Sequence, residues 1–395
     1  MFLPRGHHLA YCTNIHPAES WPETFAALEE HTVAVRARVC PGRPFAIGLR
    51  LSDLASRQLS EPAALRDFRR WLDRKDCYVF TINGFPFGQF HGARVKEQVY
   101  LPDWTSRERL EYTNRLFDLL AELLPDGVAG SVSTLPGSFK EFITSKEQVA
   151  AIETNLHECV KHIAALSARC GHALHLGLEP EPLGWFETTA ETCEFFDRLG
   201  AAHPGDPRLD EFLGVNYDTC HLAVEFEEPA EALARLRSHG IKISKIHLSS
   251  ALKCRGPLLR PDGGLRVPQL GGFADDVYLH QVVSRDAEGR LSRHRDLADL
   301  MPPHPAPGGP AWEEFRIHFH IPLHAAASDW FEPTTDHLLG VLDALPASPD
   351  LCSHLEMETY TWAVLPAELK NRSVVEQLAA EYEWCLAQLR PRGLA

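Results

Sequence analysis

The chain lacks the patterns that would place it in a membrane, outside the cell or around a disulfide framework. No apolar run approaches the roughly 20 residues of a membrane span. The N-terminal residues lack the apolar core of a secretion signal. The ten cysteines include no Cys-x-x-Cys pair, so neither a disulfide framework nor a zinc ribbon is predicted. We therefore expect a cytoplasmic protein with no inserted membrane segment.

Positive charge is also scarce. The sequence has 39 Lys and Arg against 54 Asp and Glu, a formal net charge of −15. This balance argues against nucleic acid or an anionic lipid surface as a partner. Hydrophobic residues make up 44% and charged residues 24%, as in ordinary soluble domains. A local basic pocket is still compatible with this charge balance.

Strand-like and helix-like segments alternate along the chain eight times. The predicted strands are 9–15, 45–51, 77–83, 128–135, 174–179, 212–217, 241–248 and 351–357. This alternation predicts an α/β fold, a (β/α)8 TIM barrel that spans residues 1–395 as a single domain. An open doubly wound sheet is the competing architecture, but no Gly-x-Gly-x-x-Gly turn follows the first strand.

A long interval separates the seventh and eighth predicted strands. Residues 253–327 have irregular composition, with strand-like alternation at Tyr278–Val283 and Arg316–Leu323. A Pro/Gly-rich piece, Met301–Pro310, lies between these two segments. We interpret the interval as an inserted loop region on the active face that contains a β-hairpin, and not as a separate domain.

Acidic and imidazole side chains follow the last four predicted strands. In strand order they are Glu179, Asp218 with His221, His247, and Glu356 with Glu358. In a parallel barrel, the C-terminal strand ends meet at one face and carry the active site. Carboxylates and imidazoles together suit Mn²⁺, Zn²⁺, Fe²⁺, Co²⁺ or Mg²⁺. The alternative is that these groups only satisfy one another or cap the next helix, but buried carboxylates without a cation are costly.

Other polar residues are candidates for contacts with a substrate. His318 and His320 alternate along one segment, and His320 lies nearer the expected strand end; an exposed hairpin face is the alternative. His16 ends the first predicted strand and could bind a polyol or belong to a turn. Asn83 ends the third strand and is a candidate for a contact with the substrate. The aromatic loop that follows it would either line a pocket or cover the core. Lys245 shares strand parity with His247 and is expected to balance the acidic cluster.

Several of these segments resemble one superfamily. Asp218-Thr-Cys-His221 is similar to the Asp-Thr-x-His segment of ketose 3-epimerases and other xylose isomerase-like barrels. Leu178-Glu179-Pro180 resembles strand five of sugar isomerases, and Met357-Glu358-Thr359 the closing metal glutamate. Segments similar to the EboE branch, called metabolite traffic proteins, are 11–17, 83–87, 245–251, 318–322 and 358–362. This likeness extends from Tyr11 to Trp362.

The resemblance implies a set of metal ligands, and at two places in the sequence it leaves a choice between two glutamates. The implied ligands are Glu179, Asp218, His247 and Glu358, with His221 facing the substrate or serving as a second ligand. Glu181 could replace Glu179, because it precedes Glu187 by six residues, a spacing similar to the paired glutamates of the epimerases. Glu356 could replace Glu358, because the two share strand parity.

The resemblance further implies a metal-dependent isomerase or epimerase. It would act on a sugar-like or polyhydroxylated metabolite through an enediolate, with Glu179 and Glu358 moving the proton. A lysine often follows the first glutamate of sugar isomerases where this chain has Glu181, which disfavours a plain aldose–ketose isomerase. Two alternatives stay open: a non-catalytic metabolite carrier that works with partner proteins of its pathway, and a metal-dependent hydrolase of the endonuclease-like branch. The acidic charge disfavours DNA as the substrate of the latter.

Overall fold

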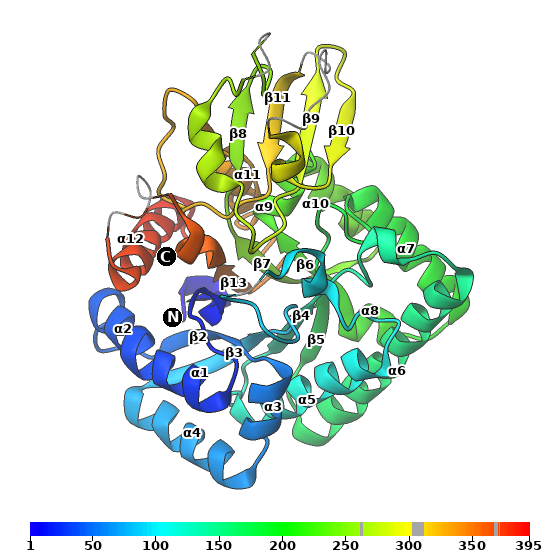
Figure 1. Ribbon diagram of the computed structural model, residues 1–395. Helices are drawn as coiled ribbons and strands as arrows, with labels where there is room; N and C mark the ends of the chain where they lie inside the picture. Colours follow the sequence, from blue (N-terminus) through cyan, green and yellow to red (C-terminus); the bar gives the residue numbers. More distant parts are fainter. Residues whose placement is uncertain (93, 261–263, 302–311, 367–369, 371) are drawn as a thin grey trace.

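The computed structural model describes residues 1–92, 94–260, 264–301, 312–366, 370 and 372–395 (Figure 1). Among these residues, eight parallel strands form one sheet in the order β1-β13-β7-β6-β5-β4-β3-β2. They are β1 (His8–Tyr11), β2 (Phe45–Arg50), β3 (Cys77–Asn83), β4 (Gly130–Thr134), β5 (Leu174–Leu178), β6 (Leu213–Asp218), β7 (Lys242–Leu248) and β13 (His354–Met357). A parallel bridge between Cys12 and Gly48 joins β1 to β2. The predicted (β/α)8 barrel is confirmed.

Helices surround the barrel on its outside (Figure 1). They are α1 (Trp21–Ala27), α2 (Val33–Val39), α3 (Asp53–Leu59), α4 (Pro62–Lys75), α5 (Arg107–Leu123), α6 (Lys146–Cys170), α7 (Thr189–Ala202), α8 (Arg208–Phe212), α9 (Thr219–Val224), α10 (Pro229–Ser238), α11 (Thr335–Ala344) and α12 (Val374–Leu389). The longest, α6, begins at a capping box of Ser145 and Gln148 and ends at Gly171, whose φ is 76°. Among the described residues, no helix is long and apolar enough to cross a membrane.

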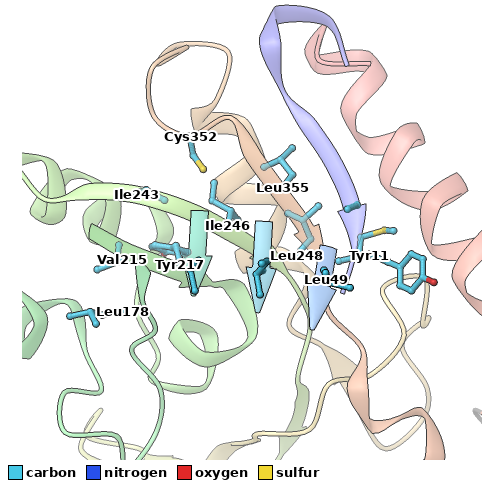
Figure 2. Packing of buried hydrophobic residues seen from close by; sticks show 14 of the residues in the cluster. Tyr11, Leu49, Leu178, Val215, Tyr217, Ile243, Ile246, Leu248, Cys352 and Leu355 are labelled. Atoms are coloured by element: carbon cyan, nitrogen blue, oxygen red, sulfur yellow. The ribbon is translucent and has the colours of Figure 1, made fainter. Parts of the chain in front are cut away.

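The strand pattern explains how polar groups reach the inside of the barrel. In β6, Val215 and Tyr217 belong to the buried apolar cluster (Figure 2), and Asn216 and Asp218 alternate with them. Successive side chains of a strand point to opposite faces, so these two polar residues share the face opposite the apolar pair. Burial on both faces is typical of parallel sheets covered by helices. The alternation therefore carries Asp218 to the barrel mouth.

The first strand is shorter than the sequence predicts. Strand β1 ends at Tyr11, and a 3-10 turn at Thr13–Ile15 follows it. The Thr13 hydroxyl accepts a hydrogen bond from the Arg50 backbone N–H at 2.8 Å, and the Thr13 carbonyl accepts one from His16 N–H at 3.1 Å. These contacts replace sheet pairing and turn the chain towards α1.

The segment between β7 and β13 contains a second sheet, which stands apart from the barrel strands in Figure 1. Its strands run antiparallel in the order β10-β9-β11-β8-β12. They are β8 (Leu252–Arg255), β9 (Val282–Asp286), β10 (Leu291–His294), β11 (Trp312–Ile317) and β12 (Glu332–Pro333). Of the predicted Pro/Gly-rich piece 301–310, residues 302–310 lie outside the described residues.

The two predicted insertion strands are shifted in the structure. β9 and β11 do pair antiparallel, with Ile317 opposite Val282, but Tyr278–Gln281 and His318–Leu323 lie outside the strands. The hairpin of adjacent strands is instead β9–β10. Residues after Ile317 leave the inserted sheet because they pack into the barrel mouth, where His318 and His320 are buried.

A buried carboxyl in α12 gives a pH-dependent prediction. Glu381 accepts hydrogen bonds from the Thr359 hydroxyl at 2.7 Å and the Leu323 N–H at 3.1 Å, and burial raises its pKa to about 7. The folded protein therefore holds a proton that the unfolded chain loses near pH 4 to 5. This contribution to stability is fully present at pH 4 and is lost as the pH rises through 7. We expect Glu381→Gln to raise the free energy of unfolding at pH 8 by about 3 kcal/mol.

Urea denaturation at pH 5 and pH 8 measures this effect. The gain from Glu381→Gln should be much larger at pH 8 than at pH 5. Glu383→Gln, on the exposed side of the same helix, is the matched control and should change neither value. An equal gain at both pH values would contradict the assignment, because it could not come from a proton.

Candidate metal centre

Four side chains from the last four barrel strands converge at the C-terminal mouth. Glu179 follows β5, Asp218 ends β6, His247 lies in β7 and Glu358 follows β13. Each offers one ligand atom, and these atoms all lie within 4.8 Å of one another. All four side chains are buried. The structure thus brings together the four residues that the sequence analysis names as ligands.

The imidazole of His247 lies at the middle of this group. Its Nδ1 is 2.9 Å from Glu179 Oε1, 3.2 Å from Glu358 Oε2 and 3.4 Å from Asp218 Oδ2. Its Nε2 is 2.9 Å from Glu356 Oε2. Because a carboxylate only accepts, Nε2–H donates to Glu356, and Nδ1 is the atom directed at the three other carboxylates. A histidine that ligates a metal is held by its second nitrogen in this way.

The charges around His247 do not balance. Lys245 Nζ lies 2.5 Å from Glu356 Oε2 and donates to Ser133 Oγ at 3.0 Å, so one lysine offsets one carboxylate. Glu179, Asp218 and Glu358 remain with His247 at 2.9 to 3.4 Å, and with the more distant imidazoles of His221 and His320 at 3.7 to 3.9 Å. Burial opposes a charged imidazole, yet the Glu358 and Glu179 carboxylates hold the pKa of His247 well above its usual range. The excess of negative charge in a buried site fits a divalent cation.

Asp218 shows how one oxygen is left for a metal. Its Oδ1 caps α9 by accepting from the N–H groups of Cys220 and His221 at 2.7 and 3.0 Å, and it accepts from Ser249 Oγ at 2.6 Å. Its Oδ2 is buried and has no hydrogen-bond partner among the described residues. Burial would raise the pKa of Asp218, but neighbouring imidazoles, His221 foremost, hold it well below its usual range. The ionised, half-satisfied carboxylate fits a metal ligand.

Glu358 is fixed by two amides. Its Oε1 accepts from Asn14 Nδ2 at 2.8 Å and Asn83 Nδ2 at 3.0 Å, which leaves Oε2 on the His247 side. Glu356 instead lies on the Nε2 side of His247, and it is not among the described residues that line the mouth cavity. Glu356 therefore lies deeper in the strand than the cavity lining, and its contact with a substrate stays a prediction.

A cavity opens above the four ligands. Its lining includes Asn14, Asn83, Phe85, Phe90, Tyr100, Glu179, Glu181, His221, Tyr278, Gln281, His318, Glu358 and Tyr360. The aromatic residues come from the loop after β3, the insertion and the segment after Glu358. Four lining residues were not predicted from the sequence, because none of them ends a barrel strand: Tyr100, Tyr278, Gln281 and Tyr360. The aromatic composition of the loops was the signal available for them.

Glu181 faces this cavity, whereas its predicted partner does not. Glu181 is buried, its Oε1 has no hydrogen-bond partner in the described part of the chain, and burial raises its pKa to about 8. Glu187 instead accepts from Lys140 and from the Leu183 N–H. The two glutamates therefore do not form a pair across the cavity, and Glu179, not Glu181, stands with Asp218 and His247.

The remaining predicted contacts divide into two groups. His221, Asn83 and His318 line the cavity, and His320 is buried behind them with its Nδ1 3.0 Å from the Glu358 carbonyl. His16 is not among the described lining residues, since its Nε2 bonds the Tyr11 hydroxyl at 3.0 Å. The turn after β1 precedes His16 and takes it out of the described cavity lining, so its contact with a substrate stays a prediction.

Comparison with solved structures identifies the fold. An L-ribulose 3-epimerase structure has a TM-score of 0.51 and 13% identity, covering 99% of this chain and 96% of that chain. D-psicose 3-epimerase from Clostridium cellulolyticum H10, solved with D-tagatose, has a TM-score of 0.51 and 11% identity, covering 98% and 100%. A D-tagatose 3-epimerase-like protein has a TM-score of 0.50 and 14% identity, covering 97% of both chains.

These similarities are structural. No protein-family model and no curated protein sequence matches the chain. The narrower resemblance to the EboE branch stays a prediction. The match over almost the full length, together with the parallel closed sheet, shows that the chain has the xylose isomerase-like TIM-barrel fold.

Proposed function

We propose that the protein is a metal-dependent isomerase or epimerase that acts on a sugar-like or polyhydroxylated metabolite. The observation that carries this proposal is the convergence of three carboxylates and one imidazole beneath a cavity of mixed polar and aromatic lining. Three structural neighbours are epimerases or epimerase-like by name, which supports the same class of chemistry. The acidic balance of the chain gives no support to a nucleic-acid substrate.

The proposed cation has a defined set of ligands. Glu179, Asp218, His247 and Glu358 would hold it, and Glu356 and the two asparagines beside Glu358 would orient two of these ligands. When bound, a divalent cation at this place would polarise substrate oxygens and so acidify the C–H bond beside a carbonyl.

The protein's own side chains would move the proton. Glu179 and Glu358 both line the cavity, so either carboxylate can reach a bound substrate. The two amides that bond Glu358 Oε1 favour its ionised form and fix its orientation. Phe85, Phe90 and Tyr360 supply apolar surface that keeps water from the reacting carbon.

Exchange of substrate hydrogen with solvent tests this function. The metal-loaded protein is incubated with a panel of ketoses in D₂O, and deuterium at the carbon beside the carbonyl is followed by NMR. We expect exchange with at least one sugar, and a rate at least ~100-fold lower for Glu179→Gln and Glu358→Gln. Glu383→Gln, an exposed glutamate, is the control and should exchange at the wild-type rate.

Two other outcomes would count against the proposal. Absence of exchange across the panel, with a stoichiometric metal bound, would contradict an isomerase or epimerase. Tight binding of a sugar that stays chemically unchanged would instead support the non-catalytic carrier.

A further inference from the structure

Three side chains that line the mouth cavity have an oxygen without a hydrogen-bond partner among the described residues. These atoms are Asn14 Oδ1, the Tyr100 hydroxyl and Glu181 Oε1, and each of the three residues is at most 5% exposed. Buried oxygens without a partner are costly, and a hydroxyl group of a ligand can donate a hydrogen bond to each of them. This part of the cavity therefore fits a polyol.

The other two amide side chains of the lining are already engaged with the protein. Asn83 donates to Glu358 Oε1 at 3.0 Å and accepts from a backbone N–H of its own loop at 3.0 Å. Gln281 donates to a backbone carbonyl at 2.9 Å, and its oxygen lies 2.8 Å from Nδ1 of His318. Unsatisfied polar atoms are thus confined to a few places in the cavity.

The described lining has no free cation for an anionic ligand. Lys96 is its only lysine or arginine, and Lys96 Nζ lies 2.6 Å from Asp296 Oδ2 and donates to the Asp275 carbonyl at 2.8 Å. Both side chains of this ion pair are buried. Three glutamates line the same cavity, so a phosphate or carboxylate away from the proposed cation would be buried beside like charge. The site favours an uncharged ligand.

Much of the remaining lining is apolar. We call this part the apolar wall; it consists of Phe85, Pro86, Phe90, Val95, Val99 and Leu279. Val95, Val99 and Leu279 are aliphatic, so they offer neither a hydrogen bond to a hydroxyl nor a flat aromatic face to a sugar ring. Side chains of this kind fit an apolar group of a ligand.

Contacts between distant segments hold the apolar wall in place. The N–H groups of residues 95 and 96 both donate to the Val277 carbonyl, at 2.8 and 2.9 Å, and so join the loop after β3 to the insertion. Beside the wall, the rings of Phe90, Tyr278 and Tyr360 pack with their centroids 5.2 Å apart in each pair. The wall is therefore a built part of the cavity.

We propose that the substrate is an uncharged polyol that carries an apolar group. This inference rests on the proposed function and specifies its substrate class. The polyol part lies at the proposed cation and the three unpartnered oxygens, and the apolar group lies against the apolar wall. Each methylene group that moves from water to this wall should tighten binding about fourfold. A plain sugar leaves the wall in contact with water.

A series of 1,2-alkanediols tests the proposal. The diol supplies two adjacent hydroxyls, and the uncharged chain grows from propane to octane. Binding is measured by ligand-observed NMR, both with Zn²⁺ and after chelation. We expect the affinity to rise about fourfold per methylene from 1,2-propanediol to 1,2-hexanediol. The anion 7,8-dihydroxyoctanoate, which ends in a carboxylate, should bind at least ~100-fold more weakly than 1,2-octanediol.

Val99→Thr provides a matched variant. Threonine keeps the shape of valine but brings a hydroxyl to the apolar wall, so the affinity for 1,2-octanediol should fall at least ~5-fold. The affinity for 1,2-propanediol, which is too short to reach far along the wall, should stay the same. Val128→Thr is the control, because Val128 is also partly buried but is not among the described lining residues.

The outcomes distinguish the substrate class from the reaction. An affinity that does not change with chain length, or no binding by any diol, would overturn the proposal, even if the protein exchanges the hydrogen of a plain ketose. A length-dependent affinity that Val99→Thr weakens, without hydrogen exchange in any sugar, would support the apolar wall as a ligand site and contradict the isomerase.

Discussion

Replacing Asp218 by alanine is expected to remove the metal from the carboxylate centre, and with it any activity that depends on that metal. Asp218 Oδ2 is the buried ligand oxygen that lacks a hydrogen-bond partner among the described residues. Groups that merely orient a ligand cost 10–100-fold in metal affinity when they are removed. Loss of the ligand itself should therefore weaken metal binding by more than about 100-fold. Competition with a chelator of known affinity measures this change.

Asp218→Asn separates the two tasks of this side chain. Asparagine is as good a helix N-cap as aspartate, so it keeps α9 capped while it removes the ligand charge. Alanine should cost about 1 kcal/mol of stability in addition, through the lost cap. Asp126→Ala, at an exposed position, is the matched control. Metal affinity at the carboxylate centre that survives in Asp218→Asn would show that the ligand set is wrong.

Replacing Lys245 by methionine is expected to destabilise the metal-free protein by about 3–5 kcal/mol. Both Lys245 and Glu356 are fully buried, with their charged atoms 2.5 Å apart. Burial opposes ionisation of Glu356, but Lys245 foremost holds the pKa of this carboxyl at about 2. Methionine fills a similar volume and removes the lysine, so that among the described residues only the His247 Nε2–H still donates to the buried Glu356 carboxylate. Urea denaturation of metal-free protein measures the loss.

The controls for Lys245 use one surface pair and one double variant. Lys161 lies 2.5 Å from Glu158, but their side chains are 38% and 43% exposed, so Lys161→Met should cost less than about 1 kcal/mol. Adding Glu356→Gln to Lys245→Met removes the unpaired charge and should recover part of the loss. A cost for Lys245→Met as small as that for Lys161→Met would mean that the buried pair inside the barrel does not stabilise the fold.

The barrel and the meeting of acidic and imidazole groups at its mouth could be predicted because both follow from the chain's periodicity, whereas the choice of Glu179 and Glu358 within that group was implied by the resemblance to sugar isomerases. Apolar runs separated by helical segments predict the parallel strands, and such strands bring their C-terminal ends together. Glu179, Asp218 and His247 stand at or next to those ends. Their positions along the chain were therefore sufficient to group them, without knowledge of any contact between their side chains.

Strand parity could not predict how deep in the barrel a residue lies. Strand parity assigns Glu356, in β13, and Glu358, which follows this strand, to the same face, but the two are separated by two residues, roughly 7 Å along a strand. The difference decides their contacts: Glu358 faces the cavity, and Glu356 pairs with Lys245 inside the barrel. Strand alternation alone assigns both the same environment, and only the neighbouring strands separate them.

The insertion could not be predicted for a different reason. Its strands pair with partners far apart in sequence, β11 with β8 and β9, so no local signal sets where each one ends. His318 and His320 follow β11 and do not lie in a strand, and both are buried in the mouth, so the alternative of an exposed hairpin face is wrong. Tyr278 and Gln281, also from the insertion, line the cavity through the same packing.

The barrel wall has a seam where β1 and β2 meet at the Cys12–Gly48 bridge. Glu358 lies inside the mouth and accepts from Asn14, which follows β1, and from Asn83, which ends β3. This carboxylate therefore connects the two sides of the seam from within, and a cation held by Glu358 would bind the closed wall in preference to an opened one. Binding of the cation at the barrel mouth and closure of the sheet between β1 and β2 are then thermodynamically linked. The affinity for the cation therefore contributes directly to the free energy of opening this seam.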